Sequence, residues 1–110
     1  MRLKDKVAIV TGAAAGFGEG IARRFAEEGA RVVVADLNAR GAAEVAEEIG
    51  NDAIAVTTDV SQRADVEQMV YAAKSAFDRV DIVVNNAGFT HRNGDLLGVD
   101  EATFDLITAV

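Results

Sequence analysis

The sequence predicts an α/β fold, in which helices cover both faces of a parallel sheet in a three-layer, doubly wound arrangement. Two observations predict this class. Short apolar runs alternate with longer segments in which apolar residues recur at helical spacing. The short runs lack polar alternation, which is typical of strands buried on both faces. Strands that alternate with helices favour parallel pairing through right-handed crossovers.

The elements follow one another as strand–helix pairs. Strands are expected at residues 7–11, 31–35, 53–57 and 81–84. Helices are expected at residues 18–28, 39–49, 62–77 and 100–110. Gly29 and Gly50 are expected to end the first two helices, and Ser61 is expected to cap the third.

The composition is that of an acidic chain with small aliphatic core residues. The 110 residues carry a formal net charge of −7, and 50% are apolar but only 5% aromatic. The negative charge argues against binding to nucleic acid or to an anionic membrane surface. The chain has no cysteine and one histidine, so no disulfide and no metal site are expected. The first apolar run is too short for a signal peptide or a membrane span, and a cytoplasmic location is expected.

A glycine-rich loop joins the first predicted strand to the first predicted helix. It reads Thr-Gly-Ala-Ala-Ala-Gly-Phe-Gly over residues 11–18, with Gly12, Gly16 and Gly18 as its glycines. Glycines permit a tight turn and let a pyrophosphate approach the backbone, and the helix N-terminus offers free N–H groups and partial positive charge. The spacing is not G-x-G-x-x-G, so a plain glycine-rich turn is the alternative interpretation.

Asp36 ends the second strand, 20 residues after Gly16. A carboxylate at this point can accept hydrogen bonds from the adenosine ribose hydroxyls and would repel a 2′-phosphate. Leu37 and loop residues 13–15 carry no positive charge, so NAD is favoured over NADP. Asp36 could instead cap the helix that starts near Asn38, and the two roles can coexist.

Polar residues also follow the third and fourth strands. Asp59-Val60 comes after the third, and Asn85-Asn86-Ala87-Gly88 comes after the fourth. Ligands of doubly wound sheets bind outside the carboxyl ends of the strands. One rim of the sheet is therefore expected to gather Thr11, Asp36, Asp59 and Asn85.

The chain resembles the short-chain dehydrogenases/reductases over its whole length. The matching pieces are the loop at 11–18, Asp36, Asp59-Val60 and the Asn-Asn-Ala-Gly string at 85–88. The resemblance implies a Rossmann fold with strand order 3-2-1-4 and assigns residues 1–110 to the N-terminal half of a dinucleotide-binding domain. Asn85 would chiefly brace the sheet. The candidate NAD-binding residues are Gly12, Gly16, Phe17, Gly18, Asp36, Leu37, Asp59, Val60, Asn86, Ala87 and Gly88.

The resemblance implies hydride transfer between a nicotinamide cofactor and an alcohol or carbonyl substrate. The family uses a tyrosine as general acid/base, a lysine four residues later, an upstream serine and an asparagine in the fourth helix. The one tyrosine, Tyr71, lies in the third predicted helix, and Lys74 follows after three residues. No catalytic residue is therefore assigned. The C-terminal catalytic half is expected to be absent, and the 110 residues alone are predicted to be inactive.

The same residues allow other interpretations. A non-catalytic nucleotide-binding or self-association module stays open. The Asn-Asn-Ala-Gly string argues against a methyltransferase-type domain. A phosphoacceptor domain needs acidic residues after the first strand, where Thr11-Gly12 stands instead. A P-loop NTPase is excluded because no Gly-Lys-Ser/Thr follows the glycine-rich loop. A homo-oligomer is expected, because residues 100–105 resemble a subunit-contact helix and the fourth strand would have an open edge. His91 and Arg92 are interpreted as solvated loop residues.

Overall fold

The computed structural model describes residues 3–86 and the backbone of residues 105–108. Its elements are β1 (Val7–Thr11), α1 (Gly16–Glu27), β2 (Arg31–Asp36), α2 (Ala39–Ile49), β3 (Ala53–Thr57), α3 (Arg63–Phe77), β4 (Ile82–Asn85) and β5 (Asp105–Thr108). The strands form one sheet in the order β3-β2-β1-β4-β5, and each neighbouring pair is parallel. The predicted α/β class and the strand order 3-2-1-4 are confirmed.

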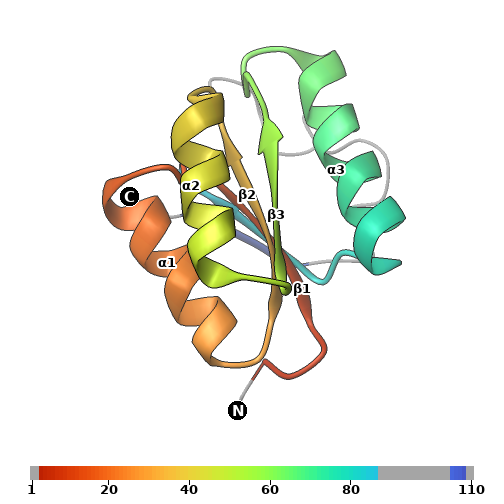
Figure 1. Ribbon diagram of the computed structural model, residues 1–110. Coiled ribbons are helices and arrows are strands. Elements are labelled where there is room, and N and C mark those ends of the chain that lie inside the picture. Colours follow the sequence, from red (N-terminus) through yellow and green to blue (C-terminus); the bar gives the residue numbers. More distant parts are fainter. Residues whose placement is uncertain (1–2, 87–104, 109–110) are drawn as a thin grey trace.

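Helices cover both faces of the sheet, with α1 and α2 on one face and α3 on the other (Figure 1). Successive side chains of a strand point to opposite faces, so each central strand contributes to two separate cores. In β1, Ile9 packs in the cluster that contains Met69 of α3. Val10 packs in the cluster that contains Ala22 of α1 and Val45 of α2. This explains why the strands are apolar without alternation.

The first three predicted helices are present, with small differences at their ends. α1 begins at Gly16, two residues earlier than expected, and α1 and α2 end before Gly29 and Gly50 as predicted. The prediction that Ser61 caps the third helix is wrong. The N-cap of α3 is Gln62, whose side chain makes no capping hydrogen bond. In the described ranges, no helix combines the length and the apolar character needed to cross a membrane.

The prediction of a helix over residues 100–110 is wrong for residues 105–108, which form β5. This strand pairs with β4 in a register that aligns Asn85 with Thr108. Pairing satisfies backbone N–H and C=O groups along β4, a tertiary gain that outweighs a short helical pattern. The open edge expected for the fourth strand is therefore also wrong, which removes one reason for expecting self-association. Residues 100–104 and 109–110 lie outside the described residues.

Candidate functional site

The carboxyl ends of the parallel strands lie along one rim of the sheet, as predicted. β1 ends at Thr11, β2 at Asp36 and β4 at Asn85. Asp59 follows β3 by two residues, and the amide of Thr58 donates to the carbonyl oxygen of Asp36 at 2.9 Å. The four predicted strand ends are thus brought together, with β2 and β1 at the centre.

The loop between β1 and α1 is fastened to the end of β2. The amide of Ala13 donates to the carbonyl oxygen of Ala35 at 3.1 Å, and the amide of Ala14 donates to Asp36 Oδ2 at 2.9 Å. Gly12 and Gly16 have φ angles of 63° and 61°, in the left-handed region where side chains are rarely tolerated. The glycines therefore set the path of the loop, and the β2 contacts hold it there.

Gly18 brings α1 into direct contact with this loop. A Cβ atom at Gly18 would lie 2.0 Å from the carbonyl oxygen of Gly12 and 2.7 Å from Asn86 Nδ2. Asn86 Nδ2 in turn donates to the Gly12 oxygen at 3.3 Å. No other residue type fits at Gly18 without moving the backbone. The close approach places the first turn of α1 directly beside the loop.

The N-terminus of α1 has no side-chain cap. Its N-cap residue, Ala15, has extended backbone angles and makes no side-chain hydrogen bond. The first amides of a helix lack partners within the helix and carry the positive end of its dipole. A glycine loop that leads into such an end suits an anionic group, and a diphosphate in particular. The residues present therefore fit the pyrophosphate of a dinucleotide.

The carboxylate of Asp36 links the loop to α2. Its Oδ2 accepts from Ala14, and its Oδ1 accepts from the amide of Asn38 at 2.9 Å. The capping residue of α2 is Asn38, whose Oδ1 accepts from the amide of Gly41 at 3.0 Å. Asp36 thus supports the capping turn without being the cap. An ionised carboxylate has about four acceptor positions, so capacity remains for ribose hydroxyls.

Two exposed apolar side chains flank this part of the rim. Phe17, in the first turn of α1, is 80% exposed, and Leu37, next to Asp36, is 68% exposed. Tyr71 is 69% exposed on α3, which agrees with its interpretation as a surface residue. Apolar surface beside polar contacts is typical of small-molecule sites. Phe17 and Leu37 therefore add exposed apolar surface next to the rim.

Asp59 is held in a tight turn after β3. Its Oδ1 accepts from the Ser61 hydroxyl at 2.6 Å and from the Ser61 amide at 3.0 Å, and its own amide donates to Asp65 Oδ2 at 2.9 Å. The hydrogen bonds from the side chain and backbone of Ser61 lower the pKa of Asp59 below its ordinary value. Asp59 is therefore an ionised acceptor at neutral pH, and Val60 beside it is half-buried.

The end of β4 is fastened to β1 through Thr11, a contact that the sequence reasoning did not foresee. The Thr11 hydroxyl donates to the carbonyl oxygen of Val84 at 3.2 Å and accepts from the amide of Asn86 at 3.0 Å. Asn85 is 5% exposed, and its Oδ1 has no hydrogen-bond partner among the described residues. Its bracing role stays a prediction. Ala87 and Gly88 lie outside the described residues.

Comparison of the sequence with known proteins identifies a family. The sequence profile of the short chain dehydrogenase family matches residues 6–110. The chain is 50% identical over 113 residues to 4-formylbenzenesulfonate dehydrogenase of Comamonas testosteroni, across 100% of this chain and 45% of the relative. It is 40% identical over 107 residues to galactitol 2-dehydrogenase of Agrobacterium fabrum, across 97% of this chain and 41% of the relative. The chain thus spans less than half the length of these relatives.

Solved structures show the same likeness. A 3-ketoacyl-(acyl-carrier-protein) reductase from Brucella melitensis, complexed with NADH, superposes with a TM-score of 0.77 at 52% identity. The match covers 90% of this chain and 42% of that chain. A hydroxysteroid dehydrogenase from Escherichia coli superposes with a TM-score of 0.76 at 46% identity, over 79% of this chain and 38% of that chain.

Proposed function

The chain belongs to the short-chain dehydrogenase family, and on this premise we propose that residues 1–110 are the NAD(H)-binding half of an oxidoreductase domain. One observation carries the proposal. The uncapped N-terminus of α1, the glycine loop and the Asp36 carboxylate are joined by the hydrogen bond from Ala14 to Asp36. Acceptors for ribose hydroxyls and donors for a diphosphate therefore lie side by side.

Each part of the rim has a proposed task. The loop amides and the first turn of α1 would hold the pyrophosphate, with Gly12 and Gly16 setting the path of the loop and Gly18 allowing α1 to pack closely against it. Asp36 would accept from the adenosine ribose. The other proposed contacts are Phe17, Leu37, Asp59, Val60, Asn86, Ala87 and Gly88.

The whole protein is proposed to act on a small alcohol or carbonyl substrate. A bound nicotinamide would supply or accept the hydride. The 110 residues contain no tyrosine followed by lysine four positions later, because Tyr71 is followed by Lys74. Tyr71 also points into solvent from α3. We therefore place proton transfer outside these residues and expect the 110 residues alone to be inactive.

Preference for NAD over NADP is part of the proposal, and Asp36 carries it. Replacing Asp36 with Ala removes a charged acceptor, so the affinity for NAD should fall about tenfold, the effect of losing one charge-assisted hydrogen bond. The affinity for NADP should fall much less, because repulsion of the 2′-phosphate is lost as well. Fluorescence titrations with NADH and NADPH measure both affinities.

Asp36→Asn is the closer variant: its single amide oxygen can still accept from Ala14, while the charge and the bond from Asn38 to the second carboxylate oxygen are lost. Asp36→Asn should shift the preference toward NADPH and keep the loop in place. If both variants lose affinity for NADH and for NADPH to the same extent, Asp36 does not contact the ribose.

Three further expectations stay predictions. A non-catalytic nucleotide-binding or self-association module is the alternative function, and it would be favoured if the whole protein, and not only these 110 residues, showed no NAD-dependent oxidation or reduction. A homo-oligomer is expected from the family resemblance, and light scattering measures it. A cytoplasmic location is expected from the sequence, and cell fractionation tests it.

A further inference from the structure

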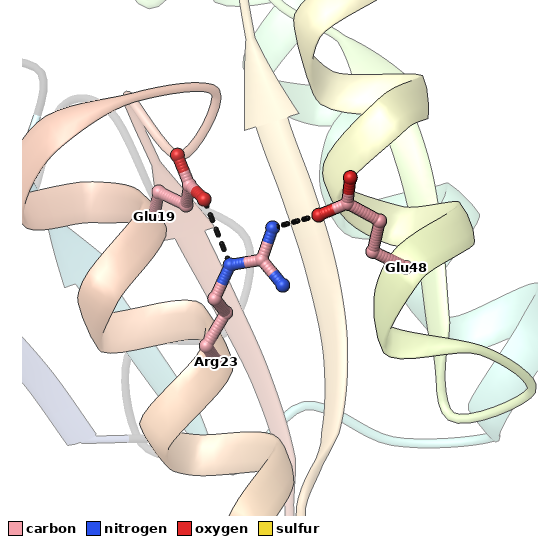
Figure 2. Close-up of polar contacts among 3 residues, drawn as sticks. All are labelled: Glu19, Arg23 and Glu48. Atoms are coloured by element: carbon pink, nitrogen blue, oxygen red, sulfur yellow. Dashed lines mark hydrogen bonds and ion pairs between the residues drawn. The ribbon is translucent and has the colours of Figure 1, made fainter.

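Arg23 joins two carboxylates that belong to different helices. Its Nε donates to Glu19 Oε2 at 2.8 Å, one turn earlier in α1. Its Nη2 donates to Glu48 Oε1 on α2 (Figure 2). Hydrogen bonds from Arg23 to Glu48 and to Glu19 raise the pKa of the guanidinium above its ordinary value. The positive charge is therefore permanent and is shared between the two helices.

Glu19 lies at the end of α1 that faces the glycine loop. It is three residues after Gly16, the first residue of the helix, which corresponds to about 4.5 Å along the axis. A carboxylate in the first turn stabilises the helix by interacting with its dipole. The same charge repels an anion bound at that end. Glu19 would thus oppose a diphosphate unless its charge were balanced.

We propose that Arg23 raises the affinity of this end of α1 for a diphosphate by neutralising Glu19. The inference rests on the proposed function, since it takes the glycine loop as the diphosphate site. Arg23 acts by balancing the charge of Glu19 and need not touch the ligand, so it is a positioning residue and not a ligand contact. The adjacent Arg24 does not share this role, because it pairs at 2.9 Å with Glu28 beyond the other end of α1.

A second role of Arg23 has to be separated from this one. The bond to Glu48 could simply hold α1 against α2. The Glu48 side chain is largely exposed, and exposed ion pairs contribute little to stability. The two roles depend on different carboxylates. Glu19 matters for the proposed electrostatic effect, and Glu48 matters for a mechanical one.

The experiment compares ADP, which carries a diphosphate, with adenosine, which carries none, by competition against NADH fluorescence in the purified protein. Arg23→Gln should lower the affinity for ADP about threefold at low ionic strength, as expected for a single charge near the site, and by less at high salt. Adenosine affinity should be unchanged. Arg24→Gln, the control with the same change in net charge, should stay close to the wild type.

Two more variants distinguish the two roles. Glu48→Gln should keep the wild-type affinity for ADP, and the double variant Glu19→Gln/Arg23→Gln should regain it. The inference is overturned if Arg23→Gln binds ADP as well as Arg24→Gln does, if the double variant stays as weak as Arg23→Gln, or if Glu48→Gln alone causes the loss. If the wild type binds neither ADP nor NADH, the proposed function itself fails and the inference falls with it.

Discussion

Aspartates have different partners at the two ends of the parallel strands, which form two opposite edges of the sheet. At the edge formed by the strand starts, Asp81 Oδ2 accepts from the amide of Val7 at 2.9 Å, and Asp81 Oδ1 accepts from Arg79 Nη2 at 2.6 Å. At the opposite edge, Asp36 accepts from the amides of Ala14 and Asn38. Among the described residues, no ion pair involves Asp36, whereas Asp81 is bonded to a guanidinium.

We interpret the edge at the strand starts as a structural edge, and the opposite edge, which is the rim described above, as the proposed binding edge. Burial raises the pKa of Asp81, but the hydrogen bond from Val7 and the hydrogen bond and charge of Arg79 outweigh it, so the pKa is lowered overall. Asp81 is thus committed to joining β1 to the start of β4. Asp36 is held in place by neutral donors and keeps acceptor capacity for a ligand. Changes at the structural edge should therefore alter stability alone, whereas changes at the binding edge should alter binding, with a loss of stability only where packing is disturbed.

The largest effect is expected for Gly18→Ala at the binding edge. The added Cβ would lie 2.0 Å from the Gly12 carbonyl oxygen, so the backbone must shift. We expect unfolding free energy to fall by about 2 kcal/mol, within the range for overpacked sites, and NADH binding to be lost. Urea unfolding and NADH fluorescence measure the two effects.

Gly20→Ala is the matched control in the same helix. A Cβ at Gly20 meets no atom within 4 Å. Alanine is a better helix former than glycine, so the variant should gain up to about 1 kcal/mol of stability and keep its affinity for NADH. Equal stability of the Gly18→Ala and Gly20→Ala variants would show that the contact with Gly12 is not tight.

Asp81→Ala tests the structural edge. It removes a hydrogen bond across strands and leaves the Val7 amide without that acceptor, which should cost about 1–3 kcal/mol of unfolding free energy. Arg79→Gln keeps the bond to Val7 and should cost less, because Arg79 is mostly exposed. Neither variant should change the affinity of the folded protein for NADH. A clear loss of NADH affinity in Asp81→Ala would mean that the two edges are not separate.

The pH dependence of stability should carry the signature of Asp81. Because its folded pKa is lowered, its contribution is present above the unfolded pKa of about 3.9 and is lost as the pH falls through the folded value. The stability difference between wild type and Asp81→Asn, from urea unfolding at several pH values, should be constant near neutral pH. It should shrink below about pH 4. A difference that widens in acid would contradict the assignment.

The smallest effects on stability are expected for the exposed aromatic residues. Phe17→Ala and Tyr71→Ala should each change unfolding free energy by no more than about 0.5 kcal/mol, as is usual for exposed positions. Only Phe17→Ala should lower the affinity for NADH, because Phe17 lies beside the loop and Tyr71 lies on the outer surface of α3. Equal NADH affinities for the two variants would remove Phe17 from the site.

Much of the fold could be predicted because its signals are local. The helical spacing of apolar residues located α2 and α3, and the structure packs Val45 of α2 in one core and Met69 of α3 in the other. β5 could not be predicted, because the spacing of Phe104 and Ile107 suits a helix and only the partner strand β4 favours another conformation. The contact of Ser61 could not be predicted either, because its hydroxyl donates to Asp59 and this pairing depends on the turn after β3.

In the candidate site, too, the residues could be predicted from local signals but their tertiary partners could not. The loop glycines and Asp36 are recognisable in the sequence by type and spacing. The bonds that organise them are not, because Ala14 and Asp36 are 22 residues apart and Thr11 and Asn86 are 75 apart. Such partners are set by strand order and register. Sequence patterns could therefore nominate the residues of the rim but not the contacts that position them.

We propose that NAD(H) binds along the carboxyl ends of the strands. NADH titrated into ¹⁵N-labelled protein and followed by amide chemical shifts tests it most directly. We expect shifts at residues 12–18, at Asp36 and at Leu37, and none at Val7 or Asp81 on the opposite edge. Unchanged spectra at saturating NADH, or shifts confined to the edge around Asp81, would contradict it.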